Sequence, residues 1–355
     1  MLDISSTSTS TRAPSTGGRI VITSIQAPTA SVVQMAEMAS SFSSSLIVVG
    51  DKKTPECEWP DSVEFISLQA QQNSEFRLAA HLPLNHYGRK NLGYLAAFKD
   101  NAGFIFDTDD DNAPMASWLP RQQSCVARRC AATGWINAYQ PFSDEHIWPR
   151  GLPLTHAGAT DRTLSLASPE RVNAPVQQGL ANGSPDVDAV WRLLLDKEVT
   201  FRAGESISLP QGAWCPFNSQ STWWFPQAYP LMYLPSFVSF RMTDIWRSFV
   251  AQRCLWELGL GVVFHGPEMF QDRNEHSLMR DFEQEIPGYL NNERIREKLE
   301  ATALLSGEAN IGGNLNRCYE ALVDMGIVPA KEMPLVEAWL ADVDAVRPVN
   351  RPSSE

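Results

Sequence analysis

Four short apolar runs, separated by helical segments, constrain the fold of this chain most strongly. They are RIVITSI (19–25), SLIVV (45–49), VEFISL (63–68) and GFIF (103–106). Helical patterns lie between them, near 30–42 and near 88–100. Strands that are apolar throughout and alternate with helices are typical of parallel sheets covered on both faces. The sequence therefore predicts an α/β fold with a mostly parallel sheet, flanking helices and, from residue 242 onward, a helical C-terminal region.

Composition divides the chain into five segments. Residues 1–18 are polar and low in complexity, which predicts a disordered leader, and 347–355 form a polar tail. We expect one half of the main domain at 19–150, the other at 151–290, and a C-terminal helical extension at 291–346. The leader lacks the apolar core of a secretory signal, so a cytoplasmic protein is expected. A Golgi-lumenal or membrane-associated setting remains open if the chain is a fragment.

The charge of the chain excludes some partners. Its formal net charge is -12 and its pI is about 5.0, which disfavours nucleic acid and anionic membranes. The sequence also lacks an apolar run of the roughly 18 residues that a membrane span needs. We therefore expect no nucleic-acid partner and no transmembrane segment. A homo-oligomer remains open.

An acidic cluster follows the fourth apolar run directly. Four carboxylates lie within five positions: Asp107, Asp109, Asp110 and Asp111. Like charges this close repel each other unless a cation lies among them. The carboxyl end of a strand is also where open α/β sheets bind ligands. The pattern is that of the D-x-D of nucleotide-sugar glycosyltransferases, which holds Mg²⁺ or Mn²⁺ against a diphosphate. A solvated acidic turn is the alternative.

Two cations open the helical segment near 88–100. Arg89 and Lys90 lie in or near its first turn, where the helix dipole disfavours positive charge. A bound phosphate would offset that cost, since it could be held by the helix N-terminus and both side chains. The alternative is that both side chains point into water or pair with the acidic cluster.

The second half carries further candidate contacts. PFNSQSTWWF combines amides, hydroxyls and aromatic rings, which suits a sugar site but also an ordinary turn. Its candidate substrate contacts are Asn218, Gln220 and Thr222. Arg150 lies on a rigid turn between Pro149 and Gly151 and offers a cation. His265 could complete the coordination of a metal held by the acidic cluster, or be a structural histidine.

One acidic residue of the second half could take part in proton transfer. Asp244 lies in the first turn of the helix predicted within TDIWRSFVAQRCLW, where an acid complements the dipole. Alternatively, Asp244 is a general base that deprotonates an acceptor hydroxyl. Trp246, in the same turn, is a candidate sugar platform, although a core position suits it better.

Taken together, these stretches resemble the STELLO-like glycosyltransferase family. The likeness runs in order through about 19–290 and is carried by nine blocks. They are IVITSIQAPT, LIVVGDKKTP, NHYGRKNLGYLAAF, GFIFDTDDDN, HIWPRGLPL, PDVDAVWRL, PFNSQSTWWF, TDIWRSFVAQRCLW and DRNEHSLMRDFEQE. The plant STELLO proteins are membrane-anchored, whereas no anchor is expected in this chain.

The resemblance implies a GT-A fold, in which a Rossmann-like sheet binds a nucleotide-sugar and the second half binds the acceptor. It implies that Asp109 and Asp111 bind Mn²⁺ or Mg²⁺, with Asp107 and Asp110 in support. Asp51 and the strand end at 23–26, including Thr23 and Ser24, would face the nucleotide. Asp244 becomes the candidate base. The implied reaction moves a sugar from a nucleoside-diphosphate sugar to a hydroxyl acceptor, with a UDP-sugar as the favoured donor and a glycan as the favoured acceptor.

A more distant likeness is to the reversibly glycosylated polypeptides, the UDP-arabinose mutases. The similarity lies in the acidic cluster and in Arg150-Gly151-Leu152-Pro153, where that family has Tyr in place of Leu and glycosylates the arginine. It raises the alternative of a UDP-sugar mutase or self-glycosylating protein. A non-catalytic scaffold that binds sugar nucleotides for polysaccharide synthesis is the third hypothesis.

Overall fold

A computed structural model describes residues 17–158, 164–195, 197–272 and 277–346. The expected tail and nearly all of the expected leader lie outside these residues. In the described part of the chain, no helix is long and apolar enough to cross a membrane.

The first half forms a parallel sheet. Its strands are β1 (Arg19–Thr23), β2 (Ser45–Val49), β3 (Val63–Ile66) and β4 (Ile105–Asp107). They pair in the order β3-β2-β1-β4, and every pair is parallel. This order is that of the first half of a Rossmann sheet. The apolar runs therefore formed the predicted strands, within two residues at each end.

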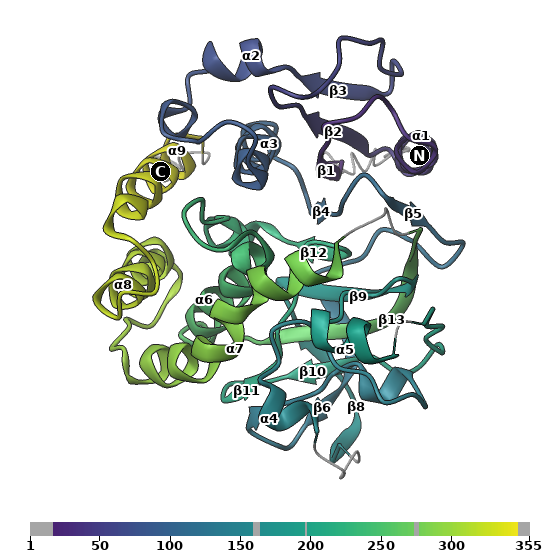
Figure 1. Cartoon of the computed structure of the whole chain (residues 1–355), viewed down its shortest axis with the longest axis vertical. Helices are drawn as coiled ribbons and strands as arrows, with labels where there is room; N and C mark the ends of the chain where they lie inside the picture. The colour runs from purple at the N-terminus through teal and green to yellow at the C-terminus, as the bar shows by residue number, and fades with distance from the viewer. Residues whose placement is uncertain (1–16, 159–163, 196, 273–276, 347–355) are drawn as a thin grey trace, which may run out of the picture.

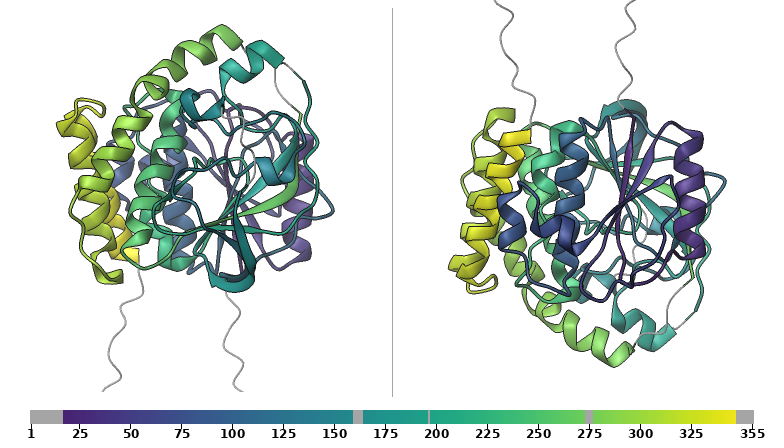
Figure 2. Two further views of the ribbon diagram at one scale, coloured as in Figure 1. Left: turned by 90° about the horizontal axis from the view of Figure 1, so that it is seen from below. Right: turned by 90° about the horizontal axis from the view of Figure 1, so that it is seen from above.

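Alternating side chains of these strands bury two different helices. Ile20 and Ile22 of β1 share a cluster with Val32 of α1 (Ala30–Ser41), while Val21 shares another with Leu92 of α3 (Lys90–Lys99). Figure 2 shows α1 on one side of the sheet and α3 on the other. Successive strand residues point to opposite faces, so strands covered on both sides must be apolar throughout.

A single glycine lets α3 approach the sheet closely. A Cβ on Gly93 would lie 2.6 Å from Val21 Cγ1 and 2.7 Å from Val49 Cγ2. Any larger residue there would push α3 away from β1 and β2. The start of α3 carries Lys90, so this packing also fixes a residue beneath the acidic cluster.

The sheet continues through the second half without interruption. The order extends from β4 as β12-β9-β13-β10-β6-β8, with β5 paired to β13, and this portion is mixed in direction. The bounds are β5 (Asn112–Pro114), β6 (Ser124–Cys130), β8 (Leu166–Asn173), β9 (Val176–Gly183), β10 (Ile207–Leu209), β12 (Thr222–Trp224) and β13 (Val262–Gln271). A second sheet pairs β7 (Gly134–Trp135) with β11 (Ala213–Trp214).

Further helices complete the fold. They are α2 (Leu68–Gln72), α4 (Leu154–Ala157), α5 (Ala189–Leu195), α6 (Thr243–Trp256), α7 (Leu278–Ala301), α8 (Ile311–Asp324) and α9 (Met333–Val346). Every residue of α6 is buried. Figure 1 shows α8 and α9 along one flank of the molecule, beside α6 and α3. The predicted α/β fold with flanking helices and a helical C-terminal region is confirmed, and its arrangement is that expected of a GT-A-like fold.

The C-terminal extension is part of the main body. Both carboxylate oxygens of Asp342 on α9 accept backbone N–H groups, from Arg77 and Leu78, at 2.9 and 2.8 Å. Trp339 packs edge-on against Phe98 of α3, with ring centroids 5.6 Å apart. The last helices therefore tie the chain's end to its first half.

Candidate functional site

The carboxyl ends of three parallel strands meet at one cavity of about 390 Å³. The cavity is lined by the chain after β1 (Thr23 to Gln26), after β2 (Gly50, Asp51 and Lys53) and after β4 (Asp109, Asp110 and Asp111). Residues of the second half close the opposite wall: Arg150, Phe240, Arg241, Asp244 and Gln271. Both halves of the chain thus contribute to one site, which we call the strand-end cavity.

The acidic cluster is held in place by neighbouring donors. Asp109 accepts a hydrogen bond from the Tyr87 hydroxyl at 2.8 Å and lies 3.2 Å from Lys90 Nζ. Asp111 Oδ2 accepts from the side-chain amide of Gln271 at 2.9 Å. The other oxygen of Asp111, Oδ1, is buried and has no hydrogen-bond partner in the described chain. This carboxylate oxygen therefore lacks the hydrogen bond or bound ion that usually compensates a buried charge.

The electrostatics of Asp109 and Asp111 favour a bound cation. Burial raises the pKa of Asp109 to about 6, partly offset by Lys90. Burial raises the pKa of Asp111 to about 7, and the charges of Asp109 and Asp110 add to the effect. A raised pKa means that the ionised carboxylates lack compensation, which a divalent cation would supply.

Carboxylate oxygens are the kind of ligand that Mg²⁺ and Mn²⁺ prefer. Within the ranges that the structure describes, no group of three or more His, Cys, Asp or Glu side chains could hold a metal. Mg²⁺, however, is often bound by one or two carboxylates together with substrate phosphates and water. Asp109 and Asp111 can provide that pair, so they fit a metal that arrives with a diphosphate.

Asp107 and Lys90 lie beneath the cavity rather than in it. Lys90 Nζ is 2.6 Å from Asp107 Oδ1, and Arg247 Nη1 is 2.9 Å from Asp107 Oδ2, with all three side chains buried. Lys90 also donates to the Thr108 carbonyl at 2.5 Å. The expectation that Asp107 and Lys90 contact the nucleotide or its phosphates is therefore corrected. Their charges neutralise one another and fix the turn that carries Asp109.

Arg89, next to Lys90, has a different environment. Its Nε donates to Gln71 at 2.7 Å, and its Nη1 donates to two backbone carbonyls at 3.3 Å. Its Nη2 is buried without a hydrogen-bond partner, and no carboxylate among the described residues forms an ion pair with Arg89. Burial lowers the pKa of Arg89, partly offset by Asp51. Arg89 lines the strand-end cavity, so an anion or a carbonyl of a ligand would complete its coordination.

The nucleotide contacts expected from the resemblance also line this cavity. Thr23 ends β1 and Ser24 follows it, and Ser24 Oγ lies 2.5 Å from Asp110 Oδ2. Asp51 accepts the backbone N–H of His86 at 2.9 Å and that of Lys52 at 2.6 Å. The backbone therefore fixes the orientation of the Asp51 carboxylate toward a ligand.

His86 is a lining residue that the sequence reasoning missed. Its Nδ1 accepts the Gly88 N–H at 2.9 Å, so a neutral ring carries its proton on Nε2. Burial lowers the pKa of His86 and keeps the ring neutral, despite Asp51. The NHYGRK stretch predicts a role for its two cations, but nothing in its pattern indicates that the histidine lines the cavity.

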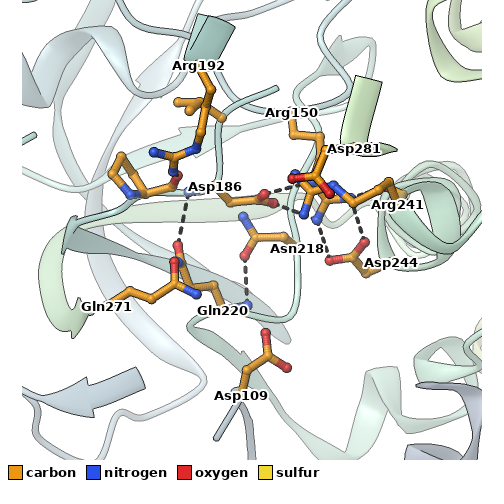
Figure 3. A pocket seen from close by; sticks show the side chains of 12 residues that line it. Asp109, Arg150, Asp186, Arg192, Asn218, Gln220, Arg241, Asp244, Gln271 and Asp281 are labelled. Carbon is orange, nitrogen blue, oxygen red and sulfur yellow. Dashed lines mark hydrogen bonds and ion pairs between the residues drawn. The ribbon is translucent and has the colours of Figure 1, made fainter. Parts of the chain in front are cut away.

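A smaller hollow of about 90 Å³ adjoins the strand-end cavity (Figure 3). The two share five lining residues, namely Asp109, Arg150, Arg241, Asp244 and Gln271. Asp186, Asn218 and Gln220 line the hollow but not the strand-end cavity. We call it the inner hollow. Its lining is polar and consists mainly of carboxylates, amides and guanidinium groups.

Arg150 organises the inner hollow. Its Nε and Nη2 donate to the two oxygens of Asp186 at 2.7 and 2.8 Å. Its Nη1 and Nη2 donate to those of Asp244 at 3.1 and 3.0 Å, and Nη1 also contacts the Arg241 carbonyl. These two carboxylates raise the pKa of Arg150 well above its ordinary value, although burial opposes them. No donor of Arg150 remains for the predicted substrate contact, so the expectation is corrected to a positioning residue.

Asp244 lies in the site but is a poor base. Burial alone would raise its pKa, but the Arg150 guanidinium, Arg247 and the Ser219 N–H together lower it below the ordinary value. A general base works best with a pKa near the operating pH. The predicted role of Asp244 as general base is therefore disfavoured by its pairing, and the residue shapes the wall instead.

Of the other predicted substrate contacts, two reach the site and two do not. Asn218 and Gln220 line the inner hollow, and Gln220 donates to Gln271 at 2.7 Å. Thr222 is fully buried on β12 and donates to Gln178, so it is a sheet residue. Trp246 is a core residue whose indole N–H donates to Asn292 at 2.9 Å. Thr222 and Trp246 line neither cavity, and those two predictions were wrong.

His265 does not lie with the acidic cluster. Its Nδ1 is 2.7 Å from Ser206 Oγ and its Nε2 is 2.9 Å from Gln177 Oε1, so both ring nitrogens are engaged. Burial lowers its pKa well below the ordinary value, and the residue lines neither cavity. The prediction of His265 as a metal ligand is corrected to the structural alternative.

Comparisons with known proteins agree with the resemblance seen in the sequence. A family model described as STELLO glycosyltransferases matches residues 241–349, which include Arg241, Asp244 and Gln271. Two relatives from Arabidopsis thaliana are the probable glycosyltransferases STELLO2 and STELLO1. They are 29% and 28% identical over 84% and 85% of this chain. The chain spans 41% of the length of each relative.

Proposed function

We propose that this chain is a STELLO-like glycosyltransferase and that it moves a sugar from a nucleoside-diphosphate sugar to a hydroxyl acceptor. A UDP-sugar is the favoured donor and a glycan the favoured acceptor. One observation carries the proposal: Asp111 and Arg89 line the same cavity at the strand ends, and each has one buried side-chain atom without a hydrogen-bond partner among the described residues, Oδ1 of Asp111 and Nη2 of Arg89. A diphosphate accompanied by a divalent cation would satisfy both.

Asp109 and Asp111 would hold Mn²⁺ or Mg²⁺ in this scheme. The metal, when bound, neutralises charge that develops on the departing diphosphate. The chain's own contribution is to hold the two carboxylates still. Tyr87, Lys90 and Gln271 do so through their hydrogen bonds to Asp109 and Asp111.

The nucleoside would occupy the part of the strand-end cavity between β1 and β2. Asp51 offers oriented acceptor oxygens, and His86 offers the Nε2–H donor of a neutral ring. Arg89 would donate its free Nη2 to an oxygen of the ligand. These groups are complementary to the hydroxyl, carbonyl and phosphate oxygens of a nucleotide.

Transfer would occur where the strand-end cavity joins the inner hollow. Asp109 lies at that junction, so a sugar attached to a metal-bound diphosphate would point into the hollow. Asn218 and Gln220 present amide groups there, which suit hydroxyl groups of the sugar or the acceptor. Arg150 fixes Asp186 and Asp244 as walls, so the hollow keeps its shape when the donor leaves.

The mutase alternative receives less support. Self-glycosylation at Arg150 would need a neutral, accessible guanidine nitrogen as nucleophile. Arg150 is buried, its donors are occupied, and its pKa is raised by two carboxylates. The non-catalytic scaffold differs from the transferase in turnover, not in binding.

The test separates these functions in two steps. The purified chain is melted with UDP-, GDP-, CMP- and dTDP-sugars, with and without Mn²⁺, because a ligand of the native state raises the melting midpoint. A Mn²⁺-dependent shift with one nucleotide family, absent in Asp111→Asn, supports the donor site. Release of free nucleotide on adding glycan acceptors then supports transfer, and binding without release favours the scaffold. No shift with any donor in folded protein contradicts the proposal.

A further inference from the structure

Two large apolar side chains that line the strand-end cavity are about half exposed. Ile25, in the bend after β1, is 51% exposed, and Phe240, in the turn η5 (Phe240–Met242), is 52% exposed. Single apolar residues on an open surface need no explanation, whereas apolar side chains in a cavity usually contact the apolar part of a ligand. The contacts proposed above for metal, phosphate and hydroxyl groups leave both side chains without a role.

The backbone on both sides of Phe240 is fixed by α7. The Ser239 hydroxyl donates to the Gln284 carbonyl, and the Arg241 guanidinium pairs with Glu285 at 2.9 Å. The turn therefore holds its shape while the side chain of Phe240 stays half exposed. A ligand that covered this ring would need to order little of the surrounding chain, so most of the contact would contribute to its affinity.

The neighbour of Phe240 connects the two ends of the strand-end cavity. The Phe240 ring packs edge-on against the Tyr87 ring, with centroids 6.0 Å apart and planes at 71°. The Tyr87 hydroxyl donates to Asp109, a proposed metal ligand. The backbone N–H of the preceding residue, His86, donates to Asp51, and these two are the proposed nucleoside contacts. Phe240 therefore lies beside the path from the diphosphate to the nucleoside.

Phe240 does not line the inner hollow. The residues of the second half that line the strand-end cavity are Arg150, Phe240, Arg241, Asp244 and Gln271, and all except Phe240 also line the hollow. The transferred sugar is proposed to point into that hollow. The diphosphate of the donor is anionic, whereas its base has a broad apolar face. The base is therefore the part of the donor that suits an exposed aromatic ring outside the hollow.

We propose that Phe240 is a stacking platform for the base of the donor nucleotide, with Ile25 as a second apolar contact from the first half. The inference rests on the proposed function, because it needs a nucleotide in the strand-end cavity. Stacking on an aromatic ring accepts any base, because every base has a π face. Phe240 thus contributes to nucleotide affinity, and the choice between bases falls to polar groups such as those of Asp51 and His86.

Calorimetric titration tests the proposal with two probes, UDP and inorganic pyrophosphate, each in the presence of Mn²⁺. Pyrophosphate has the diphosphate but no base, so it reports on the metal and phosphate contacts alone. Phe240→Ala is the test variant, and it should fold because the side chain is half exposed. Phe240→Trp keeps an aromatic face. Phe42→Ala is the matched control, since Phe42 is 38% exposed and lines neither the strand-end cavity nor the inner hollow.

We expect Phe240→Ala to bind UDP about 5–150-fold more weakly, the range that stacking of one base on an aromatic ring gives, with unchanged affinity for pyrophosphate. Phe240→Trp and Phe42→Ala should bind both probes as the wild type does, and Ile25→Ala should weaken UDP binding by a smaller factor.

Two results would overturn the role of Phe240 alone. The first is an unchanged affinity of folded Phe240→Ala for UDP, and the second is an equal loss of affinity for UDP and pyrophosphate. If neither probe binds the wild-type chain, the proposed function itself is contradicted, and the role of Phe240 falls with it.

Discussion

The strand-end cavity and the inner hollow share five lining residues but differ in how their charges are paired. Among the residues that line the strand-end cavity, Arg89 and Asp111 each have one buried atom, Nη2 and Oδ1, without a hydrogen-bond partner in the described chain. In the inner hollow, Arg150 donates hydrogen bonds to Asp186, Asp244 and a backbone carbonyl. Polar atoms of the strand-end cavity's lining residues are therefore left unpaired, whereas the Arg150 guanidinium in the inner hollow is fully paired.

The difference indicates what each region does. An unpaired polar atom away from water costs free energy that a ligand recovers, so the strand-end cavity is arranged to bind. Paired charges recover that energy within the protein, so the inner hollow is arranged to keep its shape. Substitutions in the first region should therefore affect ligands, and those in the second should affect stability.

Loss of a cluster carboxylate should have the largest effect. Asp109→Asn and Asp111→Asn keep the shape of the side chain but remove its charge, so sugar transfer should fall on the order of 10³-fold. Nucleotide release under saturating donor and Mn²⁺ measures it. Asp61→Asn, at an exposed position, is the control. Equal rates in Asp61→Asn and Asp111→Asn would remove the cluster from the mechanism.

Arg150→Met should mainly destabilise the fold. Removal of the guanidinium leaves Asp186 and Asp244 buried without their cation, which typically costs about 3–5 kcal/mol. Urea unfolding measures the loss. Arg202→Met breaks the surface pair with Asp144, where Arg202 is 52% exposed, and should cost less than about 1 kcal/mol. Similar losses for both variants would contradict the distinction between a fixed hollow and an ordinary surface.

The neighbours Arg89 and Lys90 should respond differently to the same change. Arg89→Met should weaken binding of the nucleotide donor about 10–100-fold, because a charged hydrogen bond contributes about 1.5–3 kcal/mol. Lys90→Met should lower the free energy of unfolding, because it removes one of the two cations that form ion pairs with the buried Asp107. Calorimetric titration and urea unfolding of both variants make the comparison. Donor affinity that is unchanged in Arg89→Met would remove Arg89 from the binding site.

A smaller effect should appear in the pH dependence of stability. Burial raises the pKa of Asp188, beside the inner hollow, to about 7. Hydrogen bonds from the Trp191 backbone N–H and the Trp148 indole, and the charge of Arg241, lower this pKa in part, whereas the charge of Glu285 raises it further. The folded state therefore keeps a proton that the unfolded chain releases near pH 4. Stability should fall as pH rises from about 4 to 7 and level off above.

Asp188→Asn removes this titration and should reduce the fall by about 1–2 kcal/mol, less than the full shift implies because a buried site relaxes. Urea unfolding of wild type and variant at pH 4.5, 6 and 7.5 measures the difference. Parallel pH profiles of the two proteins would contradict the assignment.

The sequence was sufficient for the strand ends but not for the partners of individual side chains. Apolar runs that end in polar residues can be identified locally, so Asp51 and the acidic cluster were correctly assigned to one edge of the sheet. The opposite orientations of Arg89 and Lys90 depend on a 3₁₀ turn at 87–89, which the pattern does not specify. The partners of Asp244 and His265 could not be inferred from the sequence because they lie far away along the chain. Arg150 is 94 residues from Asp244, and Gln177 is 88 residues from His265.

The central claim is that Asp109, Asp111 and Arg89 form one site for a metal-accompanied nucleoside diphosphate. Calorimetric titration of UDP into the wild-type chain, with Mn²⁺ and with EDTA, tests it most directly. The account predicts binding that requires Mn²⁺, is lost in Asp111→Asn and is weakened in Arg89→Met. If UDP binds equally well with EDTA, or equally well to Asp111→Asn, the carboxylate pair does not hold a metal against the diphosphate and the account is wrong.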